Sequence, residues 1–177
     1  MAPESHTHKI AYVVPTKDRP DDLLVLFNSL QTQTTMPHQI IIVDGSEPNI
    51  KYVCDEYPEL PITYERCFPP SLAKQRNAGM ARLNDDITLA GYLDDDIELD
   101  SDATEKMLAF WANAPENTGG AAIAIRDQYA QLNSRLLSFF LMAGKQPGAM
   151  LPSAYAVHLP FIGETFETKW LYGGATL

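Results

Sequence analysis

The chain has 177 residues, 45% hydrophobic and 20% charged, which fits one soluble globular domain with a substantial core. A formal net charge of −10, with 13 scattered Lys and Arg residues, argues against general nucleic-acid binding, which needs clustered cations. Two cysteines without a CxxC pair indicate neither a zinc site nor a disulfide framework, so we expect a reducing, cytoplasmic setting.

The first elements alternate between apolar runs and helical spacing. Residues 1–8 lack the apolar core of a signal peptide and are expected to form a flexible tail. Residues 9–15 predict a buried strand that ends in a polar loop, Thr16–Pro20. An amphipathic helix is expected over about 21–33, and a second apolar strand over 39–43 ends at Asp44-Gly45-Ser46.

The same alternation continues along the chain. The further expected elements are a helical stretch at 50–57, a strand at 62–68, a helix at 71–83, a strand at 87–93, a helix at 102–113 and a strand at 121–125. Asp102 and Glu105 have the spacing of a capping box. Alternating strands and helices favour an α/β fold with a mostly parallel sheet between layers of helices.

The pattern is less regular beyond Arg126. Residues 132–143 predict an apolar helix too short to span a bilayer, and no other apolar run approaches the required length. We expect the apolar residues of helix 132–143 to pack in the core, and the alternative is that they contact a membrane surface or a partner. Residues 144–160, rich in Gly and Pro, predict a long loop of functional rather than idle character.

Three aspartates, Asp94–Asp96, directly follow the strand at 87–93. Adjacent carboxylates repel one another unless a metal or basic group neutralises them, and oxygen ligands suit Mg²⁺ or Mn²⁺. The alternative is an acidic start to the next helix, whose dipole favours carboxylates. Ligands of open parallel sheets bind at the carboxyl ends of strands, so we expect the triplet, Thr16–Arg19 and Asp44–Ser46 to share one edge.

Arg76 is expected on the same face of helix 71–83 as four less polar residues, namely Leu72, Gly79, Met80 and Leu83. A partly buried guanidinium needs an anion, which could be Asp44, Asp94 or, our preference, a bound phosphate. No P-loop, GxGxxG or GxSxG motif occurs. The remaining residues suit a diphosphate ligand bridged by a divalent ion.

Four motifs in this order resemble glycosyltransferase family 2, the inverting enzymes of GT-A fold that use nucleotide-diphosphate sugars. They are Val13–Pro20, Ile40–Ser46, Gln75–Gly79 and Tyr92–Asp96. The resemblance covers about residues 9–110, and more loosely Trp170–Gly174. It implies a Rossmann-like three-layer α/β/α domain over 9–177, with a nucleotide-sugar-binding part to about 110 and the start of an acceptor-side part over about 111–177.

The resemblance also implies residue roles. Thr16 and Asp44 would line the nucleotide pocket, Asp44 accepting from a ring N–H of the base. Arg76 would lie near the base and diphosphate, Asp95 would meet the ribose, and Asp96 with Asp94 would ligate Mn²⁺ or Mg²⁺. Further residues expected to bind the nucleotide sugar are Pro15, Arg19, Gly45, Ser46 and Asn77. Those expected on the acceptor side are Trp170, Gly173 and Gly174.

The implied reaction is metal-dependent sugar transfer with inversion, from a UDP-sugar as the expected donor to a glycan or lipid-linked acceptor in polysaccharide biosynthesis. It would run in the cytoplasm or on the cytoplasmic membrane face. The family's catalytic base follows the Trp-Leu-x-Gly-Gly element, so we expect it beyond Leu177 and assign none here. The chain would then be a truncated enzyme, a naturally short one, or a donor-binding domain completed by another chain. The alternative function is a nucleotide-sugar-binding module without turnover, and exposed apolar surface could drive oligomerisation. A phosphatase or nucleotidyltransferase fits less well, because the first strand ends in Pro15–Pro20 rather than in a nucleophilic Asp or a Gly-rich loop.

Overall fold

The computed structural model describes residues 8–124, 165, 167, 168, 171, 175 and 176. The chain divides into two compact units, residues 1–119 with 173–177 and residues 120–172, and every element with described bounds belongs to the first. His8 contacts Thr88, its Nδ1 lying 3.3 Å from the hydroxyl oxygen. The predicted helix 132–143 and loop 144–160 lie outside the described residues. No helix in the described part of the chain is both long and apolar enough to cross a membrane.

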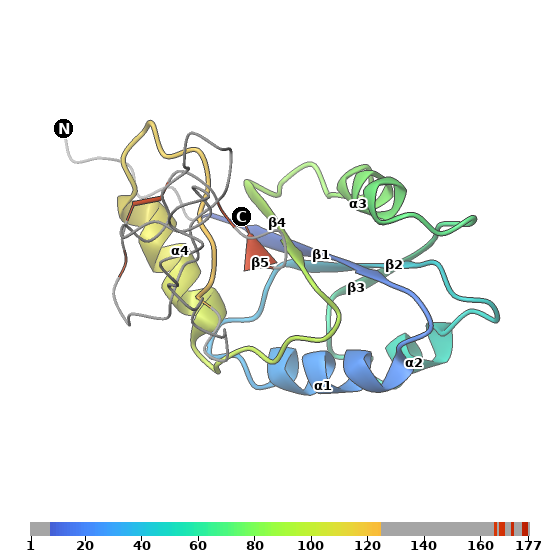
Figure 1. Ribbon diagram of the computed structural model, residues 1–177. Helices are drawn as coiled ribbons and strands as arrows, with labels where there is room; N and C mark the ends of the chain where they lie inside the picture. Colours follow the sequence, from blue (N-terminus) through green and yellow to red (C-terminus); the bar gives the residue numbers. More distant parts are fainter. Residues whose placement is uncertain (1–7, 125–164, 166, 169–170, 172–174, 177) are drawn as a thin grey trace, which may run out of the picture. The chain divides into compact units, whose positions relative to one another are not determined.

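The predicted alternation of strands and helices is confirmed. The elements are β1 (Ile10–Thr16), α1 (Pro20–Gln31), β2 (Gln39–Asp44), α2 (Lys51–Asp55), β3 (Ile62–Arg66), α3 (Leu72–Met80), β4 (Leu89–Leu93), α4 (Ala103–Asn113) and β5 (Ala175–Thr176). The sheet order is β3-β2-β1-β4-β5, with the first four strands parallel and β5 antiparallel to β4. Helices α1 and α2 cover one face and α3 the other, so the predicted three-layer α/β/α arrangement is present (Figure 1).

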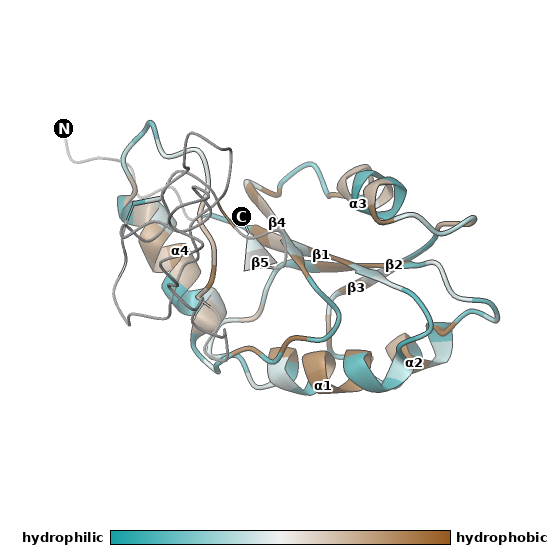
Figure 2. Cartoon of the chain, in the orientation of Figure 1, coloured by the Kyte–Doolittle hydropathy of each residue, from teal (hydrophilic) through white to brown (hydrophobic). Residues whose placement is uncertain are grey.

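The core is centred on β1 and β2, which are buried at every position. Strands covered on both faces are expected to be apolar almost without interruption, and both appear brown in the middle of Figure 2. Tyr12 of β1 is fully buried, and its hydroxyl lies 3.3 Å from the Thr104 hydroxyl of α4. The sheet therefore gives the loops at its carboxyl edge a rigid base.

The face of α3 that packs against the sheet matches the predicted one only in part: Gly79 is buried as part of that face, and Leu83 beyond the helix packs against the core. Leu72 and Met80 are 55% and 38% exposed, whereas Gln75 and Gly79 are buried. A Cβ atom on Gly79 would lie 2.2 Å from Cγ1 of Val13, so glycine is what lets the helix approach β1 this closely. The narrow space explains why the larger side chains turn outward.

Two other predictions are wrong. The Asp102 side chain does not cap α4, and Glu105 instead accepts a hydrogen bond of 2.5 Å from the Thr34 hydroxyl, so a tertiary contact replaces the capping box. No strand forms over the described residues 121–124, where Ala122 alone takes part in an isolated β bridge. The outer neighbour of β4 is β5 instead.

Candidate functional site

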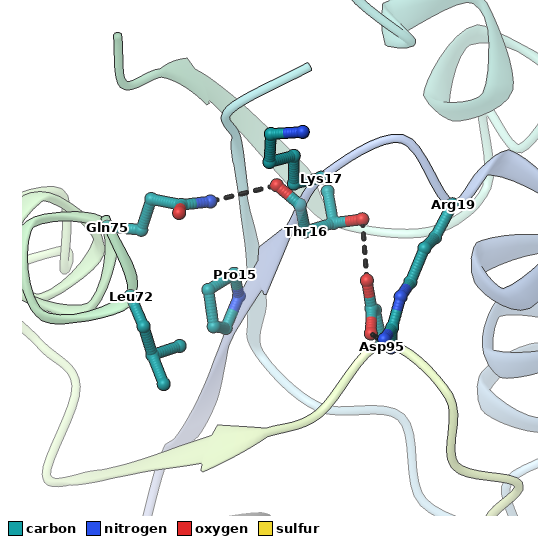
Figure 3. Close-up of a pocket in the computed structure, with 7 residues that line it drawn as sticks. All are labelled: Pro15, Thr16, Lys17, Arg19, Leu72, Gln75 and Asp95. Atoms are coloured by element: carbon teal, nitrogen blue, oxygen red, sulfur yellow. Dashed lines mark hydrogen bonds and ion pairs between the residues drawn. The ribbon is translucent and has the colours of Figure 1, made fainter. Parts of the chain in front are cut away.

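A cavity of about 310 Å³ lies where β1 ends. Its lining residues are Pro15, Thr16, Lys17, Arg19, Leu72, Gln75 and Asp95. Figure 3 shows Gln75 and Leu72 of α3 on one side of Thr16, with Asp95 and Arg19 on the other. Thr16 is also in register with Asp44 of β2. The polar strand ends predicted to share one edge of the sheet do so.

Thr16, Asp95 and Arg19 form a connected polar group at the cavity. The Thr16 hydroxyl donates to Oδ2 of Asp95 at 2.8 Å, and Nη1 of Arg19 donates to Oδ1 of Asp95 at 3.0 Å. The same Arg19 nitrogen lies 3.1 Å from Oδ2 of Asp96. The charge of Asp95, followed by its hydrogen bond, raises the pKa of Arg19. Asp95 is only 6% exposed, and this pairing offsets the cost of burying its charge.

Asp44 organises the loop after β2. Its Oδ1 accepts from the Ser46 N–H at 2.7 Å, and its Oδ2 accepts from the Ile50 N–H at 2.9 Å and the Tyr64 hydroxyl at 2.6 Å. Burial by itself raises the pKa of Asp44, but the hydrogen bonds from Ser46, Tyr64 and Ile50 outweigh it and the pKa is lowered. Asp44 is fully buried, and both of its carboxylate oxygens accept hydrogen bonds from other groups of the protein.

Asp44 has an ionic neighbour and a tyrosine partner that were not predicted. Nη1 of Arg66 lies 3.7 Å from Oδ2 of Asp44. Burial, and then the hydrogen bond to Asp44, raise the pKa of Tyr64. Both residues belong to β3, which is in register with β2, so strand pairing was the signal that could have found them.

Arg76 and Asp94 form the ion pair considered from the sequence. Nη2 of Arg76 lies 3.6 Å from Oδ1 of Asp94, and its guanidinium carbon lies 5.0 Å from the centre of the Tyr92 ring, which adds a cation–π contact. Burial, and then the charges of Asp96 and Asp95, raise the pKa of Asp94 against the opposing effect of Arg76. Asp94 therefore takes up a proton more readily than an isolated aspartate does.

Gln75 is the main site residue for which no role was predicted from the sequence, although it begins the Gln75–Gly79 motif. Its side-chain amide donates to the carbonyl oxygens of Thr16 and Val43, each at 2.8 Å, while the Gly45 N–H donates to the Thr16 carbonyl at 2.9 Å. One buried side chain thus joins α3 to the ends of β1 and β2. Its spacing of four residues from Gly79 was the available signal, because both then lie on one face of the helix.

The other predicted residues differ in placement. Ser46 is buried and its hydroxyl accepts from the Asp18 N–H at 2.8 Å, which connects the loops after β1 and β2. Asn77 is exposed on α3 and does not line the cavity. Of the acceptor-side prediction, Trp170, Gly173 and Gly174 lie outside the described residues.

The aspartate triplet offers oxygen ligands but no complete protein cage. Within the ranges that the structure describes, no three acidic, histidine or cysteine side chains converge as an ion site. The side chains of Asp94 and Asp96 are 45% and 53% exposed beside the cavity-lining residues. Mg²⁺ is usually held by one or two carboxylates together with substrate phosphates and water, so this donor set fits an ion that arrives with a phosphate ligand.

Comparisons with known proteins agree with this architecture. Residues 12–161 match the family model described as Glycosyl transferase family 2. No curated protein matches the sequence. The crystal structure of S. aureus TarS 1–349 has a TM-score of 0.54 at 20% identity over 73% of this chain and 44% of that chain.

Two ligand complexes of TarS share the fold as well. The complex with UDP has a TM-score of 0.52 at 20% identity, over 58% of this chain and 31% of that chain. The complex with UDP-GlcNAc has a TM-score of 0.50 at 20% identity, over 58% and 30%. The chain therefore spans less than half the length of these structures.

Proposed function

Because the chain belongs to glycosyl transferase family 2, we propose that the cavity at the end of β1 binds a nucleotide-diphosphate sugar. The bound donor would serve an inverting, divalent-cation-dependent transfer to a glycan or lipid-linked acceptor. The observation that carries the proposal is the cavity itself. At about 310 Å³ it is within the range of small-molecule sites, about 300–1,000 Å³, and it brings Lys17 and Arg19 together in an acidic chain.

The lining divides into parts that suit different portions of such a donor. Lys17 and Arg19 supply positive charge for a diphosphate, and a guanidinium matches phosphate geometry well. Leu72 and Pro15 supply apolar surface for a nucleobase, and Thr16 with Asp95 supplies polar groups for a ribose. TarS crystallises with UDP and with UDP-GlcNAc, which supports a uridine diphosphate sugar as the donor.

Asp94 and Asp96 would hold Mg²⁺ or Mn²⁺ together with the diphosphate oxygens. The ion, when bound, supplies stabilisation of negative charge on the departing nucleotide. Arg76 beside Asp94 would orient that carboxylate and reach toward the same phosphates. Inversion requires a base that activates the acceptor hydroxyl, and none of the described residues is assigned that role.

Calorimetric titration with UDP in the presence of Mn²⁺ tests donor binding. We expect the wild type to bind UDP and Asp96→Ala to lose the Mn²⁺-dependent part of the affinity. Asp86→Ala is the matched control, because Asp86 is an exposed aspartate paired with Lys9 outside the cavity, and its affinity should be unchanged. No binding by the wild type, or equal affinity in Asp96→Ala, would refute the proposal.

Release of free sugar from a UDP-sugar separates an enzyme from a binding module. We expect Mn²⁺-dependent release by the wild type. A chain that binds UDP with Mn²⁺ and releases no sugar over hours would retain only the donor-binding part of the proposal.

A further inference from the structure

We propose that Arg19 is an internal counter-ion that a divalent cation displaces. Without ligand, Arg19 forms ion pairs with both Asp95 and Asp96. When a metal and diphosphate bind, its guanidinium turns from these carboxylates to the phosphates. The proposal rests on the proposed function and extends it to the ligand-free state.

The geometry of one nitrogen carries the proposal. Nη1 of Arg19 is 3.0 Å from Oδ1 of Asp95 and 3.1 Å from Oδ2 of Asp96, so two successive carboxylates share a single donor. Asp95 is nearly buried and has a second partner in the Thr16 hydroxyl. A cation between these two aspartates is thus part of the folded protein before any ligand arrives.

Arg19 and a metal compete for the same oxygens. Mg²⁺ binds carboxylate oxygens at about 2.0–2.1 Å, and the guanidinium hydrogen-bonded to Oδ2 of Asp96 competes with it for the negative charge of that carboxylate. The two cations also repel each other. Binding of the metal through Asp96 is therefore strengthened when the Arg19 side chain moves away.

The local structure permits that movement. Arg19 precedes α1, and its carbonyl oxygen accepts from the Leu23 N–H at 3.3 Å. Its side chain makes no capping hydrogen bond, and it is tied to the helix by a long ion pair of 4.0 Å from Nε to Oδ2 of Asp22. The side chain is 50% exposed. Rotation about its χ angles can therefore release the aspartates without unwinding α1. The guanidinium would stay in the cavity that it lines with Lys17.

Calorimetric titration with Mn²⁺ alone, followed by UDP at saturating Mn²⁺, tests the exchange. Removal of the competing charge in Arg19→Gln should tighten Mn²⁺ binding by roughly tenfold. The same variant should bind UDP more weakly, because the charge that turns to the diphosphate is lost. Lys17→Gln is the matched control for Mn²⁺, since Lys17 lines the same cavity but pairs with Asp18. It should change Mn²⁺ affinity much less.

The outcomes separate this proposal from the proposed function. Unchanged or weaker Mn²⁺ binding by Arg19→Gln, or an equal gain in Lys17→Gln, overturns the counter-ion role. Tighter Mn²⁺ binding by Arg19→Gln in a protein that never binds UDP supports the counter-ion and overturns the donor site. Arg19→Lys, which keeps the charge, should give a Mn²⁺ affinity between wild type and Arg19→Gln. If Arg19→Gln does not fold, a Mn²⁺ affinity of Arg19→Lys equal to or weaker than that of wild type overturns the proposal.

Discussion

Replacing Gly79 with alanine should push α3 away from the sheet and lower the free energy of unfolding by about 2 kcal/mol. The new Cβ would lie 2.2 Å from Cγ1 of Val13 and 3.1 Å from Cγ2 of Val43. Both valines are fully buried in the central strands, so neither can withdraw. Overpacking costs about 1–3 kcal/mol, and so short a contact belongs at the upper end, while alanine regains about 1 kcal/mol of helix propensity.

Urea unfolding followed by circular dichroism measures this loss. Lys74→Ala, at an exposed position of the same helix, is the control and should change stability by no more than about 0.5 kcal/mol. Val13→Ala removes the colliding methyl, so in the double variant the two losses should fall short of additivity by about 1 kcal/mol or more. A Gly79→Ala protein as stable as wild type would refute the close packing of α3 on β1.

Two further predictions concern the ends of β1 and β2. Gln75→Met should lower the free energy of unfolding by about 1–3 kcal/mol, because the carbonyl groups of Thr16 and Val43 lose the buried amide that donates to both, and only the Gly45 N–H still serves Thr16. A change near zero in urea unfolding would contradict this. The lowered pKa of Asp44 means that its stabilising effect is complete above the unfolded-state value of about 3.8 and is lost as the pH falls through its folded value. Between about pH 5 and pH 2, the unfolding free energy of Asp44→Asn should thus vary less with pH than that of wild type, and parallel curves would count against the assignment.

The sequence predicts the architecture well because the central strands are apolar at nearly every position. The runs that became β1 and β2 allowed few other interpretations, and each ended at polar residues. Parallel pairing then placed Thr16 in register with Asp44, as expected from the common edge of the sheet. The Arg76–Asp94 pair was likewise among the stated alternatives.

The buried face of α3 could not be predicted from hydrophobicity. Leu72 and Met80 are the large apolar residues of that segment, yet the gap between helix and sheet admits only small or hydrogen-bonding side chains. Gly79 and Gln75 meet those conditions through size and through amide chemistry. A search for apolar residues at helical spacing detects neither the small size of a glycine nor the amide group of a glutamine.

Contacts between distant segments account for the other differences. The Glu105 carboxylate binds Thr34, a partner that no capping rule includes. Strand β5 has two residues and therefore too short a sequence for any periodicity. The bridge from Arg19 to Asp95 and Asp96 depends on the packing of two loops that are far apart in the chain.

The pairing of β5 with β4 has a consequence for synthesis of the chain. Tyr92 and Leu93 pair with Thr176 and Ala175, so the strand that leads into the aspartate triplet gains its outer neighbour from residues translated long afterwards. On the ribosome, β1 to β4 can assemble while that edge is still bare. An unpaired edge is a template for another strand, so nascent chains are most exposed to edge-to-edge aggregation in this interval. Pairing of β4 with Ala175 and Thr176 later covers this edge.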